Sequence, residues 1–186
     1  MSNFTFNKCD DIEGLYTIET KTFDDNRGYF METYNYETFK EAGLDMVFVQ
    51  DNQSMSKQGV LRGLHFQKNF PQGKLVRVLR GIVYDVAVDL RKDSKTFGKH
   101  YGVILSGDAK NQFYIPEGFA HGFLVLSKEA EFTYKCTNVY HPEDESGVIW
   151  NDSDLGIDWP TFEGVEFILS EKDKKLPPFD KNHNYF

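Results

Sequence analysis

A chain of 186 residues with 40% hydrophobic side chains is long enough to bury a sizeable core and predicts a single domain, residues 1–186. Its net charge of −8, from 21 basic and 29 acidic residues, excludes a protein that binds nucleic acid through a broad basic surface. Aromatic side chains make up 16% of the residues, which favours a β-rich fold. An anionic ligand would have to be bound by a few cations placed in a local pocket.

The two cysteines carry no signature of a zinc site or a disulfide framework. Cys9 and Cys136 lie far apart, without a CxxC motif or paired histidines, so reduced thiols in the cytosol are the simpler interpretation. The N-terminus lacks a basic segment followed by an apolar core, and no apolar run approaches the length of a membrane span. We therefore expect a cytoplasmic protein that has no contact with a membrane.

The first fifty residues predict two strands and one short helix. Residues 14–20 and 28–34 alternate as strands do, and the polar segment 22–28 between them is typical of a turn. Residues 38–42, ended by a glycine, predict a helix. Residues 45–54 are apolar in their first half and polar in their second, and no element is assigned to them.

From residue 60 to residue 140 one predicted strand follows another, separated by Gly and Pro. The candidate strands are 60–67, 74–81, 82–90, 100–106, 111–115, 121–127 and 131–140. In the clearest of them, Asp85 and Asp89 share one face and apolar residues share the other. Short strands without intervening helices predict an all-β fold, an antiparallel sandwich or barrel. We expect the tail after Trp150 to wrap this barrel through one or two short helical turns.

Two stretches have the spacing of cupin motifs. Gly59 is followed after five residues by His65, and Pro116–His121 matches the element P-x-G-x-x-H. In metal-binding cupins the first motif continues with a second His and a Glu, but Gln67 stands at that His position, and Val125 stands where an Asn is expected. Two histidines fall short of the three ligands that a catalytic metal needs. We therefore expect a cupin-like skeleton without a metal site, and a metal-dependent oxygenase is a distant alternative.

Further motifs follow one another along the chain: Leu61–Gln67, Pro71–Val76, Tyr84–Arg91, Ile115–Phe123, Tyr134–Thr137 and Leu169–Asp173. In order and spacing they closely resemble the dTDP-4-dehydrorhamnose 3,5-epimerase family, from about Asp24 to Asp173. The resemblance implies a metal-free, cupin-type antiparallel jelly-roll β-barrel with a few short helices. It also implies an enzyme that acts without a cofactor on a dTDP-linked 4-keto-6-deoxy sugar.

The resemblance implies a role for each catalytic residue. The C4 carbonyl of such a sugar acidifies the protons at C3 and C5, so inversion needs a base, a proton donor on the opposite face and a cation for the enolate oxygen. His65 matches the base and Asp173 the acid that fixes its tautomer. Tyr134 matches the donor. Lys74 and Arg62 fit as the cations for the keto oxygen and the diphosphate.

Taken one at a time, His65 and Tyr134 also fit a purely structural role. His65 would be a core histidine and Tyr134 a barrel tyrosine, although Tyr134 lies in an alternating, half-polar series that suits the wall of a wet cavity. Arg62 and His65 are three residues apart, so a regular strand would direct them to opposite faces. A bulge at Gly63 would turn both into one cavity, and a regular ladder through 61–67 would contradict this hypothesis.

The resemblance also implies residues that bind the substrate around and beyond the sugar. They are Arg27, Phe30, Glu32, Gln50, Asp51, Asn52, Arg62, Lys74, His121, Tyr140, Glu145 and Lys172. Tyr140 matches an aromatic residue that stacks on thymine, and Arg27 offers a planar fork for diphosphate oxygens. Two alternatives stay open: Arg27 balances its acidic neighbours, and His121 only shapes a strand. Because this family pairs its N-terminal strands across a two-fold axis, we expect a homodimer in which Arg27 serves its own site or that of its neighbour.

The resemblance thus implies conversion of dTDP-4-dehydro-6-deoxy-α-D-glucose to dTDP-4-dehydro-β-L-rhamnose, a step that supplies surface polysaccharide. The nearest alternative is a relative that inverts only C3, or a ketoisomerase. The set of His65, Asp173 and Tyr134 favours double epimerisation, since inversion at C5 needs a donor on the far face. A non-catalytic cupin that binds nucleotide sugars would not need these three residues together.

Overall fold

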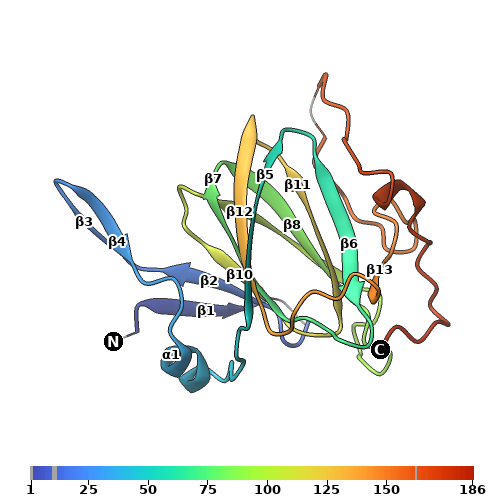
Figure 1. The fold of residues 1–186 in the computed structure, drawn as a ribbon, viewed down its shortest axis with the longest axis horizontal. Helices are drawn as coiled ribbons and strands as arrows, with labels where there is room; N and C mark the ends of the chain where they lie inside the picture. The colour runs from blue at the N-terminus through green and yellow to red at the C-terminus, as the bar shows by residue number, and fades with distance from the viewer. Residues whose placement is uncertain (1, 10–11, 162) are drawn as a thin grey trace.

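Two antiparallel sheets face each other and form the barrel (Figure 1). The computed structural model describes residues 2–9, 12–161 and 163–186. The first sheet contains, in spatial order, β1 (Phe4–Lys8), β2 (Tyr16–Thr20), β10 (Gln112–Ile115), β7 (Lys74–Arg80), β12 (Glu129–Cys136) and β5 (Gln50–Lys57). The second contains β13 (Glu145–Gly147), β6 (Leu61–Gln67), β11 (Phe119–Val125), β8 (Ile82–Asp89) and β9 (His100–Ser106).

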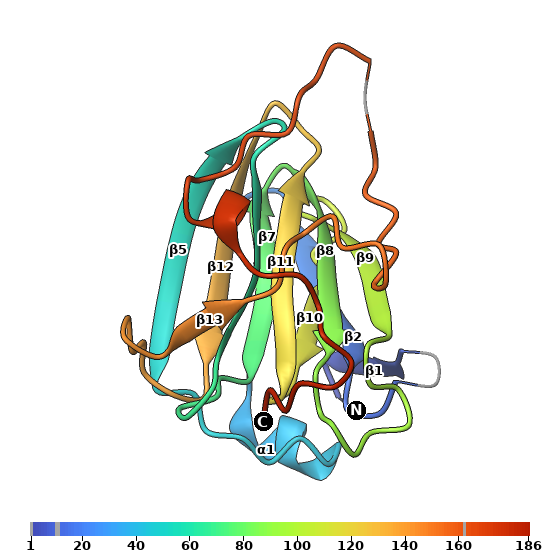
Figure 2. The ribbon, with the colours of Figure 1, turned by 90° about the vertical axis from the view of Figure 1, so that its right-hand side faces the viewer.

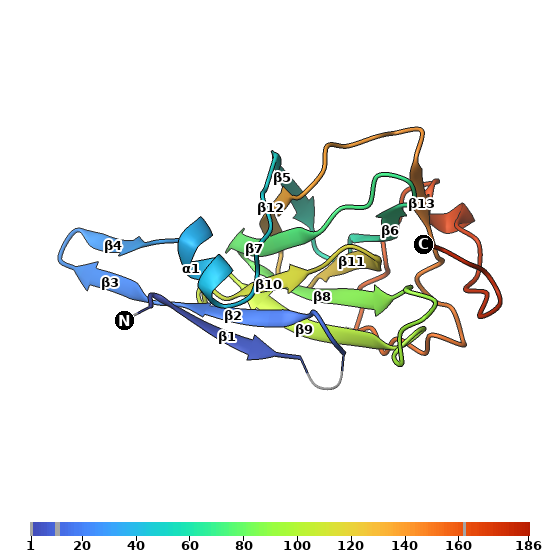
Figure 3. The same ribbon diagram turned by 90° about the horizontal axis from the view of Figure 1, so that it is seen from below.

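Three smaller elements lie outside the two sheets. They are the hairpin of β3 (Thr22–Asp25) and β4 (Gly28–Met31), the helix α1 (Tyr36–Glu41) and the 3₁₀ turn η1 (Asp173–Lys175). The hairpin projects beyond the barrel (Figures 1 and 3), while the C-terminal tail crosses the outer face of the second sheet (Figure 2). In the described residues, no helix is long and apolar enough to cross a membrane.

Apolar side chains form a core between the sheets and two further cores outside them. Phe113 and Phe132 of the first sheet meet Phe123 of the second in the interior. The tail covers the outer face of the second sheet, where Trp159 packs among residues of β6, β8 and β11. Phe39 of α1 is buried on the outer face of the first sheet. The interior core leaves one end of the barrel to polar residues, and this end holds the pocket described below.

Strand β8 is buried on both faces because the tail covers one and the interior takes the other. The prediction that apolar residues share one face and the two aspartates the other is confirmed. Val86 and Val88 face the outer core, whereas Asp85 and Asp89 lie on the inner face of the strand. Both carboxylates are fully buried. Asp89 accepts hydrogen bonds from Arg91, Ser94 and Thr96 at the strand end, so it organises the following turn, whereas Asp85 faces the pocket end.

The all-β, antiparallel prediction is confirmed, and most predicted strands are present with shifted ends. The prediction of a turn over residues 22–28 is wrong for the first half of that segment, which forms β3. The prediction 131–140 is too long, since β12 ends at Cys136. β1, β5 and β13 were not predicted. The expected helix 38–42 is α1, which begins earlier because the side chain of Asn35 accepts a hydrogen bond from the backbone N–H of Thr38.

The ladder through β6 is irregular at Gly63, as the bulge hypothesis requires. His65 is paired with His121 of β11, but Arg62 is paired with Phe123, so the register shifts between them. Gly63 has a φ of 119°, a conformation that other residues rarely adopt. Arg62 and His65 consequently line the same pocket, and the hypothesis is confirmed.

Replacing Gly63 by alanine is expected to destabilise the protein by about 3 kcal/mol or more. A Cβ on Gly63 would lie 2.6 Å from the Cα of Gly122 and 2.7 Å from the carbonyl oxygen of His121. Gly43→Ala is the matched control, because Gly43 also has a positive φ of 86° but has nothing within 4 Å of its Cβ position. Urea denaturation of both variants checks this, and equal losses of unfolding free energy would contradict it.

Candidate active site

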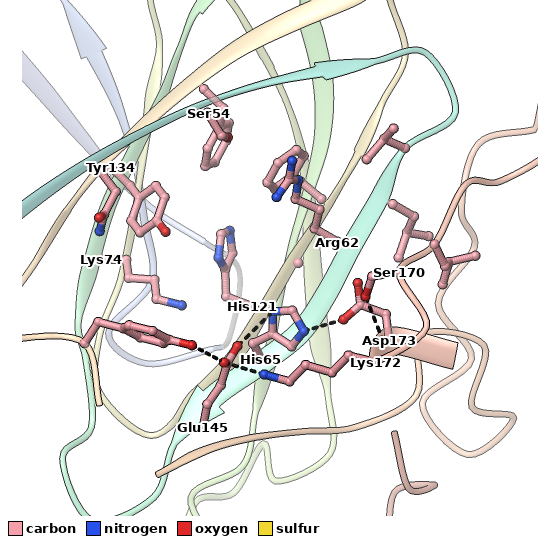
Figure 4. Close-up of a pocket in the computed structure, with 18 of the residues that line it drawn as sticks. Ser54, Arg62, His65, Lys74, His121, Tyr134, Glu145, Ser170, Lys172 and Asp173 are labelled. Carbon is pink, nitrogen blue, oxygen red and sulfur yellow. Dashed lines mark hydrogen bonds and ion pairs between the residues drawn. The ribbon is translucent and has the colours of Figure 1, made fainter. Parts of the chain in front are cut away.

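A cavity of about 670 Å³ lies between the sheets at the end of the barrel that the tail approaches (Figure 4). β5, β7 and β12 form one wall, β6 and β11 form the other, and the tail forms part of the rim. The lining includes Gln50, Asn52, Ser54, Arg62, His65, Gln72, Lys74, His121, Phe132, Tyr134, Tyr140, Glu145, Ser170, Lys172 and Asp173. The cavity therefore has the volume of a small-molecule site and an unusual density of ionisable side chains.

His65 and Asp173 form a hydrogen-bonded pair on one wall. His65 Nε2 lies 2.6 Å from Asp173 Oδ1, and the backbone N–H of Asp173 donates to Ser170 Oγ. Burial by itself would raise the pKa of Asp173, but the hydrogen bonds from His65 and Ser170 outweigh burial and hold that pKa below its usual value. An ionised Asp173 accepts the Nε2–H, which leaves Nδ1 of His65 as the basic nitrogen.

Asp173→Asn is expected to cost about 2 kcal/mol of stability near neutral pH, the usual contribution of a hydrogen bond to a charged group. Because the pKa of Asp173 is lowered on folding, its contribution is present above the unfolded carboxyl pKa of about 3.9 and is lost as the pH falls through the folded value. The difference between wild type and variant should therefore shrink below about pH 4. Thermal melts from pH 3 to pH 7 measure it, and a difference independent of pH would contradict this assignment.

Tyr134 and Lys74 stand on the opposite wall. They come from β12 and β7 of the first sheet, whereas His65 comes from β6 of the second (Figure 4). Burial raises the pKa of Tyr134, so its phenol stays protonated at neutral pH and can donate a proton. Burial lowers the pKa of Lys74, and the nearby Cys136 and Asp85 oppose that shift. A space bounded by a base on one side and a proton donor and an amine on the other is suited to proton exchange at carbon.

Arg62 supplies a cation further along the same cavity. Its guanidinium donates to the hydroxyl of Ser56, and no carboxylate among the described residues forms an ion pair with it. A cation without a counter-charge inside a pocket is suited to an anionic group of a ligand.

Glu145, Tyr140 and Lys172 form a cluster at the rim. The Tyr140 hydroxyl donates to Glu145 at 2.5 Å, and Lys172 Nζ donates to the same carboxylate oxygen. The hydrogen bond to Glu145 and burial raise the pKa of Tyr140 to about 12. Glu145 Oε1 lies 3.7 Å from Nδ1 of His65, so this cluster borders the basic nitrogen.

His121 lies at the back of the cavity and is held by Asp85. Its Nε2 lies 3.0 Å from each oxygen of that carboxylate. Burial lowers the pKa of His121, opposed by Asp85, so the ring is neutral near pH 7. Sequence analysis placed His121 among the ligand residues but gave no role to Asp85. The sequence signal was that Asp85, like Asp89, is an acidic residue in a mainly apolar strand.

Four of the predicted ligand residues do not line this cavity. Arg27, Phe30 and Glu32 belong to the β3–β4 hairpin or follow it, and the Phe30 side chain is 70% exposed. Asp51 alternates with Gln50 and Asn52 on β5, so it points to the outer face, where it pairs with Lys135. Sequence analysis gave no role to Ser54, Gln72 and Ser170, which line the cavity. Gln72 and Ser170 lie within the motifs Pro71–Val76 and Leu169–Asp173, whereas Ser54 lies in a segment without an assigned element.

In the described parts of the chain, no group of three or more His, Cys, Asp or Glu side chains is placed to hold a metal ion. The acids and histidines of the cavity instead form separate pairs. His65 is bonded to Asp173 and His121 to Asp85. Each pair holds a ring nitrogen with a carboxylate oxygen, an arrangement that fixes a tautomer.

The chain is similar to known proteins over nearly its whole length. The family model described as dTDP-4-dehydrorhamnose 3,5-epimerase matches residues 10–181. The enzyme of that name from Methanothermobacter thermautotrophicus is 55% identical over 185 residues, which cover 100% of both chains.

Two solved structures are also similar over nearly their whole length. A dTDP-4-dehydrorhamnose 3,5-epimerase from Elizabethkingia anophelis has a TM-score of 0.92 at 54% identity, covering 99% of this chain and 100% of that one. A 3,5-epimerase from Legionella pneumophila, solved in complex with dTDP-4-keto-L-rhamnose, has a TM-score of 0.89 at 48% identity, with 95% and 99% covered. The fold and the sequence together show that this chain belongs to the dTDP-4-dehydrorhamnose 3,5-epimerase family of enzymes.

Proposed function

We propose that this protein inverts C3 and C5 of dTDP-4-dehydro-6-deoxy-α-D-glucose and so forms dTDP-4-dehydro-β-L-rhamnose. The observation that supports it best is the placement of the His65–Asp173 pair and the Tyr134 phenol on facing walls of one cavity. Inversion of a carbon acidified by a ketone needs these two groups on opposite faces of the sugar. The comparisons agree with this substrate, since the Legionella pneumophila relative was solved with dTDP-4-keto-L-rhamnose.

The proposed reaction proceeds through an enolate. Nδ1 of His65 removes the proton from the carbon next to the ketone, and Asp173 stabilises the imidazolium that forms. The electron pair of the C–H bond moves toward the ketone, so negative charge develops on the C4 oxygen. The ammonium group of Lys74 stabilises this charge. Tyr134 then gives its proton to the opposite face of the same carbon as the enolate electron pair returns and the ketone re-forms. The imidazolium of His65 releases its proton to solvent, and Tyr134 recovers one from solvent. Repetition at the second carbon completes the double inversion.

The remaining polar groups of the cavity suit the nucleotide diphosphate. Arg62 offers a guanidinium without a carboxylate partner in the described residues, which fits a phosphate oxygen. Tyr140 presents an aromatic ring at the rim, and an aromatic face suits a thymine base. Lys172 and Glu145 close the rim beside it.

Incubation of the protein with dTDP-4-dehydro-6-deoxy-glucose in D₂O, followed by proton NMR and mass spectrometry, tests the proposal. We expect deuterium at both C3 and C5 and the L-rhamno configuration in the product. Deuterium at C3 alone would show a single epimerase instead. Tight binding without exchange at either carbon would show a nucleotide-sugar-binding protein and would contradict the catalytic role.

We further propose a homodimer in which the β3–β4 hairpin of one subunit reaches the cavity of the other. The hairpin projects away from its own barrel (Figure 1), and the exposed Phe23, Tyr29 and Phe30 would be covered by such an exchange. Within its own subunit Arg27 forms an ion pair with Asp25, its acidic neighbour in the hairpin. Its side chain is 85% exposed, so it would add a cation to the neighbouring diphosphate site by exchanging this partner for phosphate. A cytoplasmic location is also proposed, which the buried free thiol of Cys136 supports.

Arg27→Ala is expected to raise KM for the nucleotide sugar by about tenfold or more, because a charge-assisted contact with phosphate is lost. Arg80→Ala is the matched control, since Arg80 is also exposed but lies at the end of β7 beside Glu129. Co-expression of differently tagged Arg27→Ala and His65→Ala chains decides which subunit supplies the arginine. If the hairpin serves its neighbour, the purified heterodimer contains one intact site and shows the KM of the wild type. If it serves its own cavity, the one site that keeps His65 lacks Arg27, and the heterodimer shows the raised KM of Arg27→Ala.

A further inference from the structure

A second histidine–carboxylate pair lies at the back of the pocket, and the epimerisation mechanism above gives it no role. Asp85 is fully buried on β8, and His121 is nearly so on β11. In the described chain, the Nε2–H of His121 is the one hydrogen bond that the Asp85 carboxylate accepts, shared by both oxygens at 3.0 Å. A buried carboxylate needs a donor, so Asp85 requires the proton on Nε2.

The other ring nitrogen of His121 must therefore border the cavity. Nδ1 has no hydrogen-bond partner among the described residues. Every buried side-chain nitrogen or oxygen atom of these residues does have a partner, so Nδ1 is not one of the buried atoms. Nδ1 is thus open to the pocket, which His121 lines. Phe132 lies 6.2 Å away with its ring inclined by only 21°, and packing on this ring helps to hold the imidazole plane.

The charge of the ring decides what Nδ1 can bind. Three titratable groups on neighbouring strands act on the charge of His121: Asp85 from β8, Lys74 from β7 and His65 from β6. Burial lowers the pKa of His121, Asp85 opposes this, and Lys74 and His65 add to it. A neutral ring with its proton on Nε2 carries a lone pair on Nδ1. Such a nitrogen accepts a hydrogen bond from a hydroxyl and does not bind a phosphate oxygen.

We propose that Asp85 is a positioning residue for the epimerisation, which fixes His121 as the Nε2–H tautomer so that Nδ1 accepts a hydrogen bond from a hydroxyl group of the hexose. The contact holds the ring carbons between His65 and Tyr134, which lie on either side of His121 (Figure 4). It also selects sugars that carry a hydroxyl at the contacted carbon, because a deoxy analogue would leave Nδ1 without a donor. The inference rests on the proposed sugar substrate.

The tautomer can be read without turnover, so its test is separate from that of the proposed reaction. In protein labelled with ¹⁵N-histidine, long-range ¹H–¹⁵N correlation spectra should show His121 neutral and protonated on Nε2 at pH 7. If the wild-type protein shows an imidazolium or a neutral ring with its proton on Nδ1, this result by itself overturns the proposal.

Two variants of Asp85 distinguish the effect of losing the hydrogen bond to His121 from the effect of damaging the fold. Asp85→Leu removes the acceptor, so the proton should move to Nδ1 and kcat should fall roughly 100-fold. Asp85→Asn keeps a carbonyl oxygen for Nε2–H and should retain both the tautomer and a kcat within about tenfold of wild type. The affinity for dTDP alone, which has no hexose, should be unchanged in both. A folded Asp85→Leu variant with wild-type kcat, or one that loses dTDP binding to the same extent as turnover, would overturn the proposal.

Discussion

Replacement of His65 by alanine is expected to lower kcat by roughly 1,000-fold, because it removes the base that begins both inversions. The fall should appear at C3 and C5 together in the D₂O exchange experiment. In the proposed mechanism, Nδ1 of His65 lies next to the reacting carbon, while Nε2 is held by Asp173 at 2.6 Å. The loss should therefore lie in kcat, with little change in the affinity for dTDP.

His141→Ala provides the matched control for this variant. His141 is also partly exposed and also lies beside a carboxylate, Glu143, at 3.1 Å, but it does not line the cavity. We expect its kcat to stay within about twofold of wild type. Equal losses in the two variants would point to damage of the fold, and retention of exchange in His65→Ala would assign the base to another residue.

The proposed exchange of protons depends on residues that are distant in sequence and come together only in the fold. His65 and Asp173 are separated by 108 positions, and Asp173 reaches the cavity because the tail returns across the second sheet (Figure 2). An isolated bridge between Val60 and Ile168 fixes this return. Spacing along the chain cannot indicate such a pair, so the family resemblance was needed to connect them.

The strand prediction succeeded where one face of a strand is apolar and failed where both faces are polar. β8 was predicted closely because apolar residues recur at every second position. β5 was missed because Gln50 and Asn52 point into the polar cavity while Asp51 points to the outer face. A strand that lines a wet site thus loses the alternation by which strands are recognised.

The role proposed for Asp85, and the choice of the subunit that Arg27 serves, could not be derived from the sequence, for different reasons. Asp85 owes its importance to His121 on the neighbouring strand, and that pairing is set by the register of β8 against β11. The hairpin residues predicted to bind the ligand do not line the cavity of their own barrel, so the site that they serve depends on the second chain of the proposed homodimer. The bulge at Gly63, by contrast, was predictable, since only a glycine between Arg62 and His65 allowed both to face one cavity.

Tyr134→Phe is expected to separate proton removal from inversion. The variant keeps the ring and its packing beside Phe132 but loses the hydroxyl that reprotonates the far face. His65 can still remove a proton, exchange it with solvent and return it to the same face. Deuterium should therefore enter the sugar without inversion, and formation of the L-rhamno product should fall about 100-fold.

The ratio of deuterium incorporation to inverted product is the measurement that distinguishes this role. Tyr114→Phe is the control, because Tyr114 is a buried tyrosine of β10 that does not line the cavity, and its ratio should equal that of wild type. A parallel loss of exchange and inversion in Tyr134→Phe would mean that the phenol acts in proton removal. Because burial raises the pKa of Tyr134, the wild-type enzyme should keep its donor protonated throughout the neutral range. Inversion should then persist on the alkaline side of pH 7 for as long as Lys74 remains charged.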